Sequence, residues 1–270
     1  MDKILLKKLN LIKVKSPRLN DWKRVVDAKL NPKKKVSIAV VGKYVDLKDS
    51  YKSLNEALDH AGIVNLAKVD IQMIDAAKIT KTNVSKILKS SQAVLVPGGF
   101  GSRGIEGMIH ACQFARENKL PYFGICLGMQ IAIIEFSRNV LKLKNANSTE
   151  FNVKTKHPVI GLVTEWKDAS GKIEHRSESS NLGGTMRLGG QKCMIKKSSL
   201  SHKLYKKMTI TERHRHRYEV NPEYKNELIA GGMDIVGTSL DGNLAEMIEI
   251  KKHPWFLGCQ FHPEFTSNPR

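Results

Sequence analysis

The chain has 270 residues, of which 41% are hydrophobic and 26% are charged. This composition is typical of a globular protein with a large core, and it excludes disorder, collagen-like repeats and a disulfide scaffold. Lys and Arg outnumber Asp and Glu by 45 to 26, a formal net charge of +19 that leaves nucleic-acid binding open as a function class.

The basic charge is concentrated at the start of the chain. Residues 1–35 hold twelve Lys or Arg and three Asp, a net charge of +9. Leu5, Leu9 and Ile12 share one helical face, and Pro17 and Pro32 interrupt the stretch. The sequence therefore predicts a basic linker or docking helix over residues 1–35, followed by one domain over residues 36–270.

The sequence carries no export or membrane signal. The apolar run at residues 4–6 is far shorter than the apolar core of a signal peptide. No window approaches the roughly 18 consecutive apolar residues of a membrane-spanning helix. We therefore expect a cytoplasmic protein without a membrane partner, whose four cysteines are reduced and lack the close pairing of a zinc site.

Apolar strands alternate with helices from residue 36 onward. Strands are predicted over residues 36–41, 69–74, 93–96 and 122–125, and helices over residues 50–60 (closed by Gly62), 84–89, 104–118 and 127–138. After residue 151 the pattern changes to short strands and glycine turns at residues 183–184 and 189–190, with one helix near residues 222–230 and last strands over residues 235–240, 244–250 and 256–261. Strands that are apolar throughout predict a doubly wound, flavodoxin-like α/β fold with a mostly parallel central sheet and helices on both faces.

Doubly wound sheets bind ligands at the carboxyl ends of their strands, and three of the predicted ends carry unusual residues. The first is the turn at residues 97–104, where Gly99, Gly101 and Gly104 match the dinucleotide pattern GxGxxG. The turn follows the third strand instead of the first, which disfavours a dinucleotide site. A plain turn, or a turn that presents backbone N–H groups to an oxyanion, fits equally well.

The second strand end is Gly-Ile-Cys-Leu-Gly at residues 124–128. Glycines on both sides of a central nucleophile permit the sharp strand-to-helix turn of a nucleophile elbow. The N-terminus of the following helix favours a thiolate at Cys126. A buried structural cysteine is the alternative. Cys112 and Cys193 lie in ordinary helix and strand patterns and are weaker candidates.

The third strand end belongs to the last predicted strand. Alternation places Cys259 on one face, with Gln260 and His262 on the other, and Pro263 ends the strand so that Glu264 can reach back to His262. Metal binding by Cys259 and His262 is the alternative, but no second ligand pair accompanies them. Together the three ends offer a nucleophile, a base, an orienting carboxylate and oxyanion donors, which are the components of a catalytic triad site.

These residues resemble the motifs of class I (triad) glutamine amidotransferases, with PGGFG at 97–101, GICLGMQ at 124–130 and FHPE at 261–264. Longer strings resemble the glutaminase domains of CTP synthases: NANSTEF at 145–151, SESSNLGGTMRLG at 177–189, ERHRHRYEVN at 212–221 and CQFHPEFTSNP at 259–269. The resemblance covers most of residues 36–269. Residues 1–35 resemble the end of a synthetase domain and the linker that follows it.

The resemblance implies a site. Cys126 would be the nucleophile, His262 the general base and then acid, and Glu264 the residue that orients His262. The backbone N–H groups of two residues would hold the oxyanion: Gly99 and Leu127. The implied glutamine-binding set comprises Gly99, Leu127, Gly128, Met129, Gln130, Glu150 and Arg217. The charges of these residues agree with such a role, because the Arg217 guanidinium can pair with the α-carboxylate of glutamine and the Glu150 carboxylate can pair with its α-ammonium group. On composition alone, residues 213–217 would be a solvated basic strand or an RNA contact.

The resemblance also implies the wider reaction. Glutamine hydrolysis would supply ammonia for the amination of UTP to CTP, with no metal or cofactor bound by this chain. ATP, Mg and UTP would bind the synthetase domain, which lies outside this chain, and GTP would be an allosteric activator. The expected partners are L-glutamine, the CTP synthase synthetase domain and further copies in a homotetramer of the intact enzyme. Because the family normally continues into a closing helix, we expect the domain to be short at its C-terminal end.

Three other functions are compatible with parts of the sequence: another class I amidotransferase or γ-glutamyl hydrolase, a non-catalytic docking subunit, and a basic nucleic-acid-binding module. The strings at 177–189 and 212–221 argue against the first. The third would show strongly salt-dependent affinity. Nearly half of the excess charge lies in residues 1–35 and the rest is mostly Lys, so a bias toward Lys explains the charge more simply than a nucleic-acid partner, and we expect none.

Overall fold

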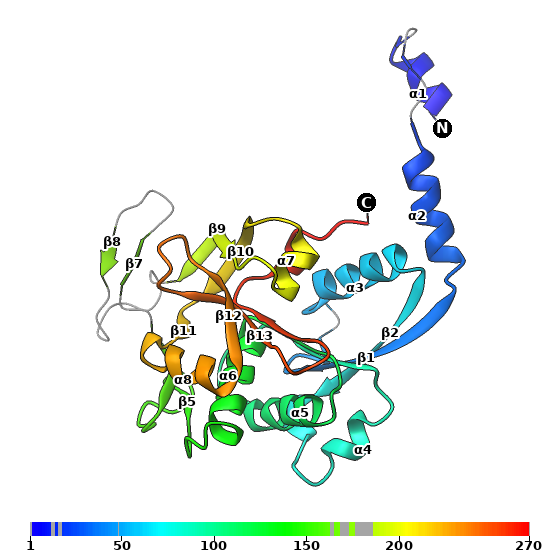
Figure 1. Cartoon of the computed structure of the whole chain (residues 1–270). Coiled ribbons are helices and arrows are strands. Elements are labelled where there is room, and N and C mark those ends of the chain that lie inside the picture. The colour runs from blue at the N-terminus through cyan, green and yellow to red at the C-terminus, as the bar shows by residue number, and fades with distance from the viewer. Residues whose placement is uncertain are drawn as a thin grey trace.

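The computed structural model describes residues 2–11, 14–15, 18–47, 49–162, 165–167, 173–175 and 186–269 (Figure 1). In chain order the elements are α1 (Asp2–Lys8), α2 (Asn20–Leu30), β1 (Lys34–Gly42), α3 (Lys52–Val64), β2 (Ala67–Asp75), η1 (Ala76–Lys78), α4 (Val84–Leu88), β3 (Ala93–Val96), α5 (Ile105–Glu117), β4 (Tyr122–Ile125), α6 (Leu127–Asn139), β5 (Asn147–Ser148), β6 (Pro158–Leu162), β7 (Glu165–Lys167), β8 (Ile173–His175), β9 (Arg187–Ile195), α7 (Leu200–Tyr205), β10 (Thr209–His216), β11 (Tyr218–Val220), η3 (Pro222–Tyr224), α8 (Lys225–Gly231), β12 (Met233–Thr238), β13 (Ala245–Ile250), β14 (Phe256–Cys259) and η4 (Pro263–Phe265).

A nine-stranded sheet forms the centre of the molecule. Its strand order is β10-β9-β12-β13-β14-β4-β3-β1-β2. The pairings from β2 through β1, β3 and β4 to β14 are parallel, and those from β14 to β10 are antiparallel. The predicted α/β fold with helices on both faces is confirmed. The carboxyl ends of β1, β3, β4 and β14 meet at one edge of the sheet, where the candidate residues were expected.

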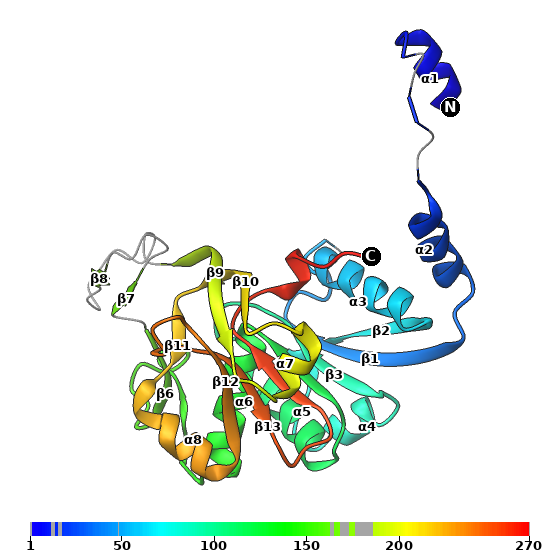
Figure 2. The same cartoon turned by 45° about the horizontal axis from the view of Figure 1, so that its top comes forward.

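Alternate residues of the central strands enter two separate cores. In β1, Ala39 and Val41 pack into the core that contains α5 and α6, whereas Val40 packs into the opposite core together with Leu54 of α3. Figure 2 shows α3 and α5 on opposite sides of the sheet. Because a strand presents successive side chains to opposite faces, a strand buried on both faces must be apolar at every position. This explains the uninterrupted apolar runs in the sequence.

Two local predictions were wrong, and one helix was missed. The helix expected to close at Gly62 continues to Val64, and a Cβ on Gly62 would lie 2.5 Å from the carbonyl oxygen of Ala67. This glycine therefore permits close packing of α3 on β2 and does not end the helix. The turn expected at residues 189–190 lies inside β9, where Gly189 has φ of 87° and pairs with His214. Helix α7 was not predicted from the sequence. The turn expected at residues 183–184 lies outside the described residues.

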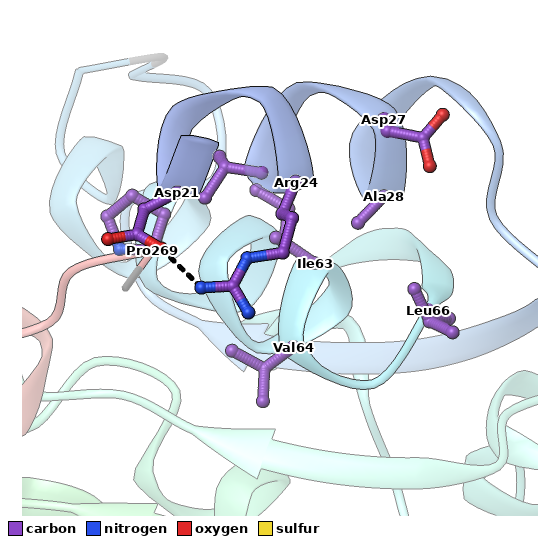
Figure 3. Close-up of a pocket in the computed structure, with 9 residues that line it drawn as sticks. Asp21, Arg24, Asp27, Ala28, Ile63, Val64, Leu66 and Pro269 are labelled. Carbon is purple, nitrogen blue, oxygen red and sulfur yellow. Dashed lines mark hydrogen bonds and ion pairs between the residues drawn. The ribbon is translucent and has the colours of Figure 1, made fainter. Parts of the chain in front are cut away.

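Helices α1 and α2 form an arm that projects from one end of the sheet (Figures 1 and 2). None of the described α2 side chains is buried, and Lys29 makes an exposed ion pair of 3.2 Å with Asp59 of α3. A pocket of 580 Å³ lies between α2 and α3, and its lining residues include Ala28 of α2 and Ile63 of α3 (Figure 3). Within the described ranges no helix, the arm included, is long and apolar enough to cross a membrane.

Deleting residues 1–30 is expected to leave the thermal unfolding midpoint within about 2 °C of that of the full chain. The contacts of α2 with α3 are exposed, as in the Lys29–Asp59 ion pair, and exposed ion pairs contribute little to the free energy of unfolding. The shortened chain would keep Lys33, whose backbone N–H donates to Leu66, and all of β1. Thermal unfolding followed by circular dichroism would measure the change. A fall of several degrees would place the arm inside the folded domain and would contradict the predicted boundary at residue 36.

Candidate active site

Cys126 lies at a sharp turn between β4 and α6, with φ of 52° and ψ of −101°. A non-glycine residue rarely adopts a positive φ, so the surrounding structure must hold it there. The backbone N–H of Cys126 donates to the carbonyl of Cys259 at 2.7 Å. A Cβ on Gly128 would lie 2.0 Å from the Val96 carbonyl oxygen, and one on Gly124 would lie 2.5 Å from Gly128. Both glycines are therefore required by the close packing of β3, β4 and α6 around the predicted elbow.

His262 and Glu264 lie beside this turn. The Nδ1 atom of His262 is 2.8 Å from Oε1 of Glu264, and the backbone N–H of His262 donates to the Arg213 carbonyl at 2.8 Å. Gly98 lies against both the imidazole and Cys126, because a Cβ on Gly98 would be 2.7 Å from Cε1 of His262 and 3.6 Å from the Cys126 Cβ. The structure thus brings the three predicted triad residues together around a glycine that leaves room for them.

Charge interactions shift the pKa of the candidate base, and burial shifts the pKa of three cysteines outside the elbow. Burial alone would lower the pKa of His262, but hydrogen bonds and charge interactions with Cys126 and Glu264 outweigh burial and raise that pKa to about 10. These contacts favour the charged form of the imidazole next to the Cys126 sulfur. Burial raises the pKa of the thiols of Cys112, Cys193 and Cys259, which keeps them in the unreactive protonated form.

The glycine-rich turn after β3 lies over the elbow. Gly99 is next to Leu127, because a Cβ on Gly99 would lie 3.3 Å from Cδ2 of Leu127. Leu127 is the first residue of α6, where backbone N–H groups have no partner within the helix. The N–H of Gly101 donates to Oε1 of Glu150 at 2.8 Å. This placement fits a turn that presents N–H groups to an oxyanion better than a dinucleotide turn.

Lys43 is part of the site but was missed by the sequence analysis. It is 3% exposed, and its Nζ donates to the carbonyls of Phe100 (3.1 Å) and Gly101 in the glycine-rich turn. Burial lowers its pKa to about 8, although the charge of Glu150 opposes this. Its position directly after β1, at the same sheet edge as the other candidates, is the signal that could have found it.

Three of the predicted glutamine-binding residues lie near Tyr218: Gln130, Glu150 and Arg217. Gln130 Nε2 donates to the Tyr218 carbonyl at 3.0 Å. Burial and the charge of Glu150 raise the pKa of the Tyr218 hydroxyl, and Arg217 opposes them, so both charged groups lie near it. Among the described residues, the buried Nε of Arg217 has no hydrogen-bond partner, which suits a donor reserved for a carboxylate. The side chain of Met129, by contrast, is buried in the core under α6.

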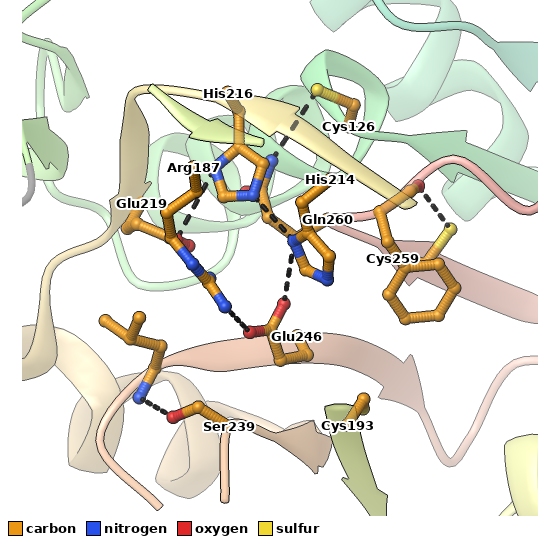
Figure 4. Close-up of polar contacts among 12 residues, drawn as sticks. Cys126, Arg187, Cys193, His214, His216, Glu219, Ser239, Glu246, Cys259 and Gln260 are labelled. Carbon is orange, nitrogen blue, oxygen red and sulfur yellow. Dashed lines mark hydrogen bonds and ion pairs between the residues drawn. The ribbon is translucent and has the colours of Figure 1, made fainter. Parts of the chain in front are cut away.

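Behind the elbow lies a buried polar group of side chains that we call the Arg187 cluster (Figure 4). It comprises Arg187, His214, His216, Glu219 and Glu246. Arg187 contacts Glu219 at 2.6 Å and Glu246 at 2.9 Å, and Nδ1 of His214 is 2.8 Å from Nε2 of His216. Burial and the charge of Arg187 lower the pKa of His214 to about 2. Burial, then the charges of His214 and Arg187, lower the pKa of His216 well below its usual value. Residues 213–217 are therefore not a wholly solvated basic strand.

Metal binding by Cys259 and His262 finds no support in their contacts. The Cys259 thiol donates to the Phe261 carbonyl at 3.4 Å and packs in the core, whereas His262 contacts Glu264. In the described parts of the chain, no group of three or more His, Cys, Asp or Glu side chains could hold a metal ion.

Comparisons with known proteins agree with this geometry. The profile of the family described as Glutamine amidotransferase class-I matches residues 46–270. The glutaminase domain of Trypanosoma brucei CTPS, solved with bound acivicin, is 38% identical with a TM-score of 0.77, and the match covers 87% of this chain and 88% of that chain. A glutamine amidotransferase from Methylobacillus flagellatus is 9% identical with a TM-score of 0.50, covering 85% of this chain and 70% of that chain, and it supports the fold alone.

Proposed function

This chain belongs to the class I glutamine amidotransferase family, and from that premise we propose that it is the glutaminase domain of a CTP synthase with a Cys126–His262–Glu264 triad. Glutamine hydrolysis is the activity that the family membership gives to the chain. The observation that carries the residue assignment is the Cys126 elbow, which packs beside the hydrogen-bonded His262–Glu264 pair. The narrower assignment is supported by the 38% identity to a CTPS glutaminase domain.

The first half of the proposed reaction forms a thioester. The Cys126 thiolate attacks the side-chain amide carbon of glutamine, and the electron pair of the C=O bond moves to the oxygen. The backbone N–H groups of Gly99 and Leu127 hold this oxyanion. When the intermediate collapses, the C–N bond breaks and His262 gives its proton to the departing nitrogen. Ammonia leaves, and a γ-glutamyl thioester stays on Cys126.

The second half releases glutamate. His262, now neutral, takes a proton from water, and the resulting hydroxide attacks the thioester carbon. The C–S bond then breaks, and its electron pair returns to the sulfur. Glu264 accepts a hydrogen bond from Nδ1 of His262 throughout, which fixes the ring and stabilises its charged form. Every step uses protein groups, so we propose no metal or cofactor for this chain.

Substrate recognition follows from charge. The unpartnered guanidinium Nε of Arg217 would bind the α-carboxylate of glutamine, and Glu150 would bind the α-ammonium group. Glu150 also accepts from Gly101, so substrate binding and the glycine-rich turn share one carboxylate. Gln130 would contribute to the same pocket through its side-chain amide, and the first turn of α6, including Gly128 and Met129, would contribute through its backbone.

We extend the proposal to the reaction that uses the ammonia. Ammonia would pass to a synthetase domain, where ATP, Mg and UTP bind and UTP is aminated to CTP in pyrimidine biosynthesis. GTP would stimulate the glutaminase step, and the intact enzyme would be a cytoplasmic homotetramer. The support is the similarity to the CTPS glutaminase domain. Combining the chain with a CTP synthase synthetase domain tests this. CTP formed from ammonium but not from glutamine would contradict the partner while leaving the glutaminase assignment intact.

Covalent labelling would test the nucleophile. Because acivicin is bound in the T. brucei domain, we expect it to inactivate this chain by forming one adduct on Cys126. Peptide mass spectrometry would locate the adduct, and ammonia release would follow the loss of activity. An adduct on Cys112, Cys193 or Cys259, or full activity after complete labelling, would contradict the assignment. These three thiols are all buried, so they act as internal controls in the same sample.

A further inference from the structure

The Cys126 sulfur has a second hydrogen-bonding neighbour besides His262. Nε2 of Gln260 lies 3.7 Å from Sγ of Cys126, within hydrogen-bond range for sulfur (Figure 4). We propose that Gln260 is a catalytic residue, whose amide N–H aims the sulfur at the substrate and stabilises the thiolate when it is released. Its part in turnover rests on the proposed glutaminase function.

The contacts of Gln130 determine which end of the Gln260 amide faces the sulfur. Nε2 of Gln130 donates to the carbonyl of Tyr218 at 3.0 Å, and a carbonyl can only accept. The same Nε2 lies 3.3 Å from Oε1 of Gln260, so that atom must be the acceptor of this second hydrogen bond. The NH₂ group of Gln260 is therefore left to face Cys126. The hydrogen-bond network therefore determines the orientation of the Gln260 amide.

The amide is also held rigidly. Gln260 is 0% exposed, and its backbone N–H donates to the carbonyl of Glu246 at 2.9 Å. The residue before it, Cys259, accepts the backbone N–H of Cys126 at 2.7 Å. The sulfur and the amide thus belong to two chain segments that are hydrogen-bonded to each other. In a buried site water cannot replace a missing donor, so a hydrogen bond to a charged sulfur is worth more than one at the surface.

Gln260 can do what His262 cannot. His262 must give its proton to the leaving nitrogen and later take one from water, so its hydrogen bond to the sulfur changes during the cycle. An amide does not ionise, and its N–H can remain directed at the sulfur in every step. When the thioester breaks, the electron pair of the C–S bond returns to sulfur, and the Gln260 N–H meets the developing charge without transferring a proton. Gln260 should therefore have its largest effect on thioester hydrolysis.

The test removes the donor and keeps the shape. In Gln260→Met, the pH midpoint of Cys126 alkylation by iodoacetamide is expected to rise by about one unit, which lowers the rate below the midpoint about tenfold. The γ-glutamyl thioester should also accumulate during turnover, so that kcat falls while KM does not rise. Cys259→Ala is the packing control. It removes a buried neighbouring side chain and should lower the unfolding temperature without moving the alkylation midpoint.

A second variant provides the test if Gln260→Met does not fold. Gln260→Leu removes the same amide N–H with a smaller apolar side chain and adds no charge near the sulfur. We expect the alkylation midpoint to rise in this variant too. A midpoint unchanged in whichever of the two variants folds would overturn the inference. Iodoacetamide needs no glutamine site, so a wild type that is alkylated but does not hydrolyse glutamine would instead contradict the proposed function.

Discussion

Cys126→Ala is expected to lower the kcat of glutamine hydrolysis by about 10⁴-fold or more, because without the sulfur no thioester can form. The oxyanion donors and the charged substrate contacts stay in place, so glutamine binding should change little. Ammonia release, measured with an enzyme-coupled assay, would give kcat, and isothermal titration with glutamine would give the affinity. Loss of binding together with activity would mean that the elbow had collapsed, and the activity result would then say nothing of the nucleophile.

Cys112→Ala is the matched control, since Cys112 is a fully buried thiol on α5. It should lose some stability and keep its activity. A Cys126→Ala variant that still hydrolyses glutamine, beside a Cys112→Ala variant that does not, would overturn the assignment. An NMR titration adds a second readout, because Cys126 helps to raise the pKa of His262 to about 10. Without the sulfur, the His262 imidazole should titrate at a lower pH.

The parallel half of the sheet could be predicted because the signal for each strand lies within the strand itself. Strands such as β3 and β4 are buried on both faces, so they carry no charged side chain, and the end of β3 stands out against the Pro97-Gly98 turn that follows. The elbow around Cys126 could be predicted for the same reason. Gly124 and Gly128 flank it closely, and the sequence shows both the turn and the residue that the turn exposes.

Gln260 and Lys43 could not be assigned roles in this way. The alternation in the last strand placed Gln260 on the same face as His262, but its contact with Cys126 joins residues 134 positions apart. Lys43 reaches the Phe100 carbonyl across 57 positions. No local pattern encodes which strand end lies next to which, so a polar residue at such an end cannot be distinguished from a solvated one before the sheet order is known.

The Arg187 cluster shows a further limit of pattern reasoning. Period-two alternation of apolar and polar residues marks the buried face of a strand, but residues 213–217 are all basic or histidine, so no apolar signal separates the two faces. The structure buries His214 and His216 and leaves Arg215 exposed. Burial here depends on the carboxylates that β11 and β13 supply, Glu219 and Glu246, and these lie far from Arg187 in the sequence.

This dependence leads to the largest stability effect that we expect. Arg187→Met is predicted to lower the free energy of unfolding by about 3–5 kcal/mol, because it removes the guanidinium that lies between two buried carboxylates. Urea denaturation at pH 7.5 would measure the loss. Lys35→Met is the matched control: it breaks an ion pair of 3.1 Å with Asp70, but both side chains are exposed, so the loss should stay below about 1 kcal/mol.

The pH dependence separates lost charge pairing from lost packing. Burial already raises the pKa of Glu246 above 4.5, and Arg187 opposes that rise, so removing Arg187 should raise the pKa further. A carboxyl group with a raised folded-state pKa keeps its proton in the folded state after the unfolded chain has lost it. The folded state is therefore penalised increasingly as the pH rises above about 4.5. The gap in unfolding free energy between wild type and Arg187→Met should be larger at pH 7.5 than at pH 5. An equal gap at both values would assign the loss to the packing of the arginine stem and not to its charge.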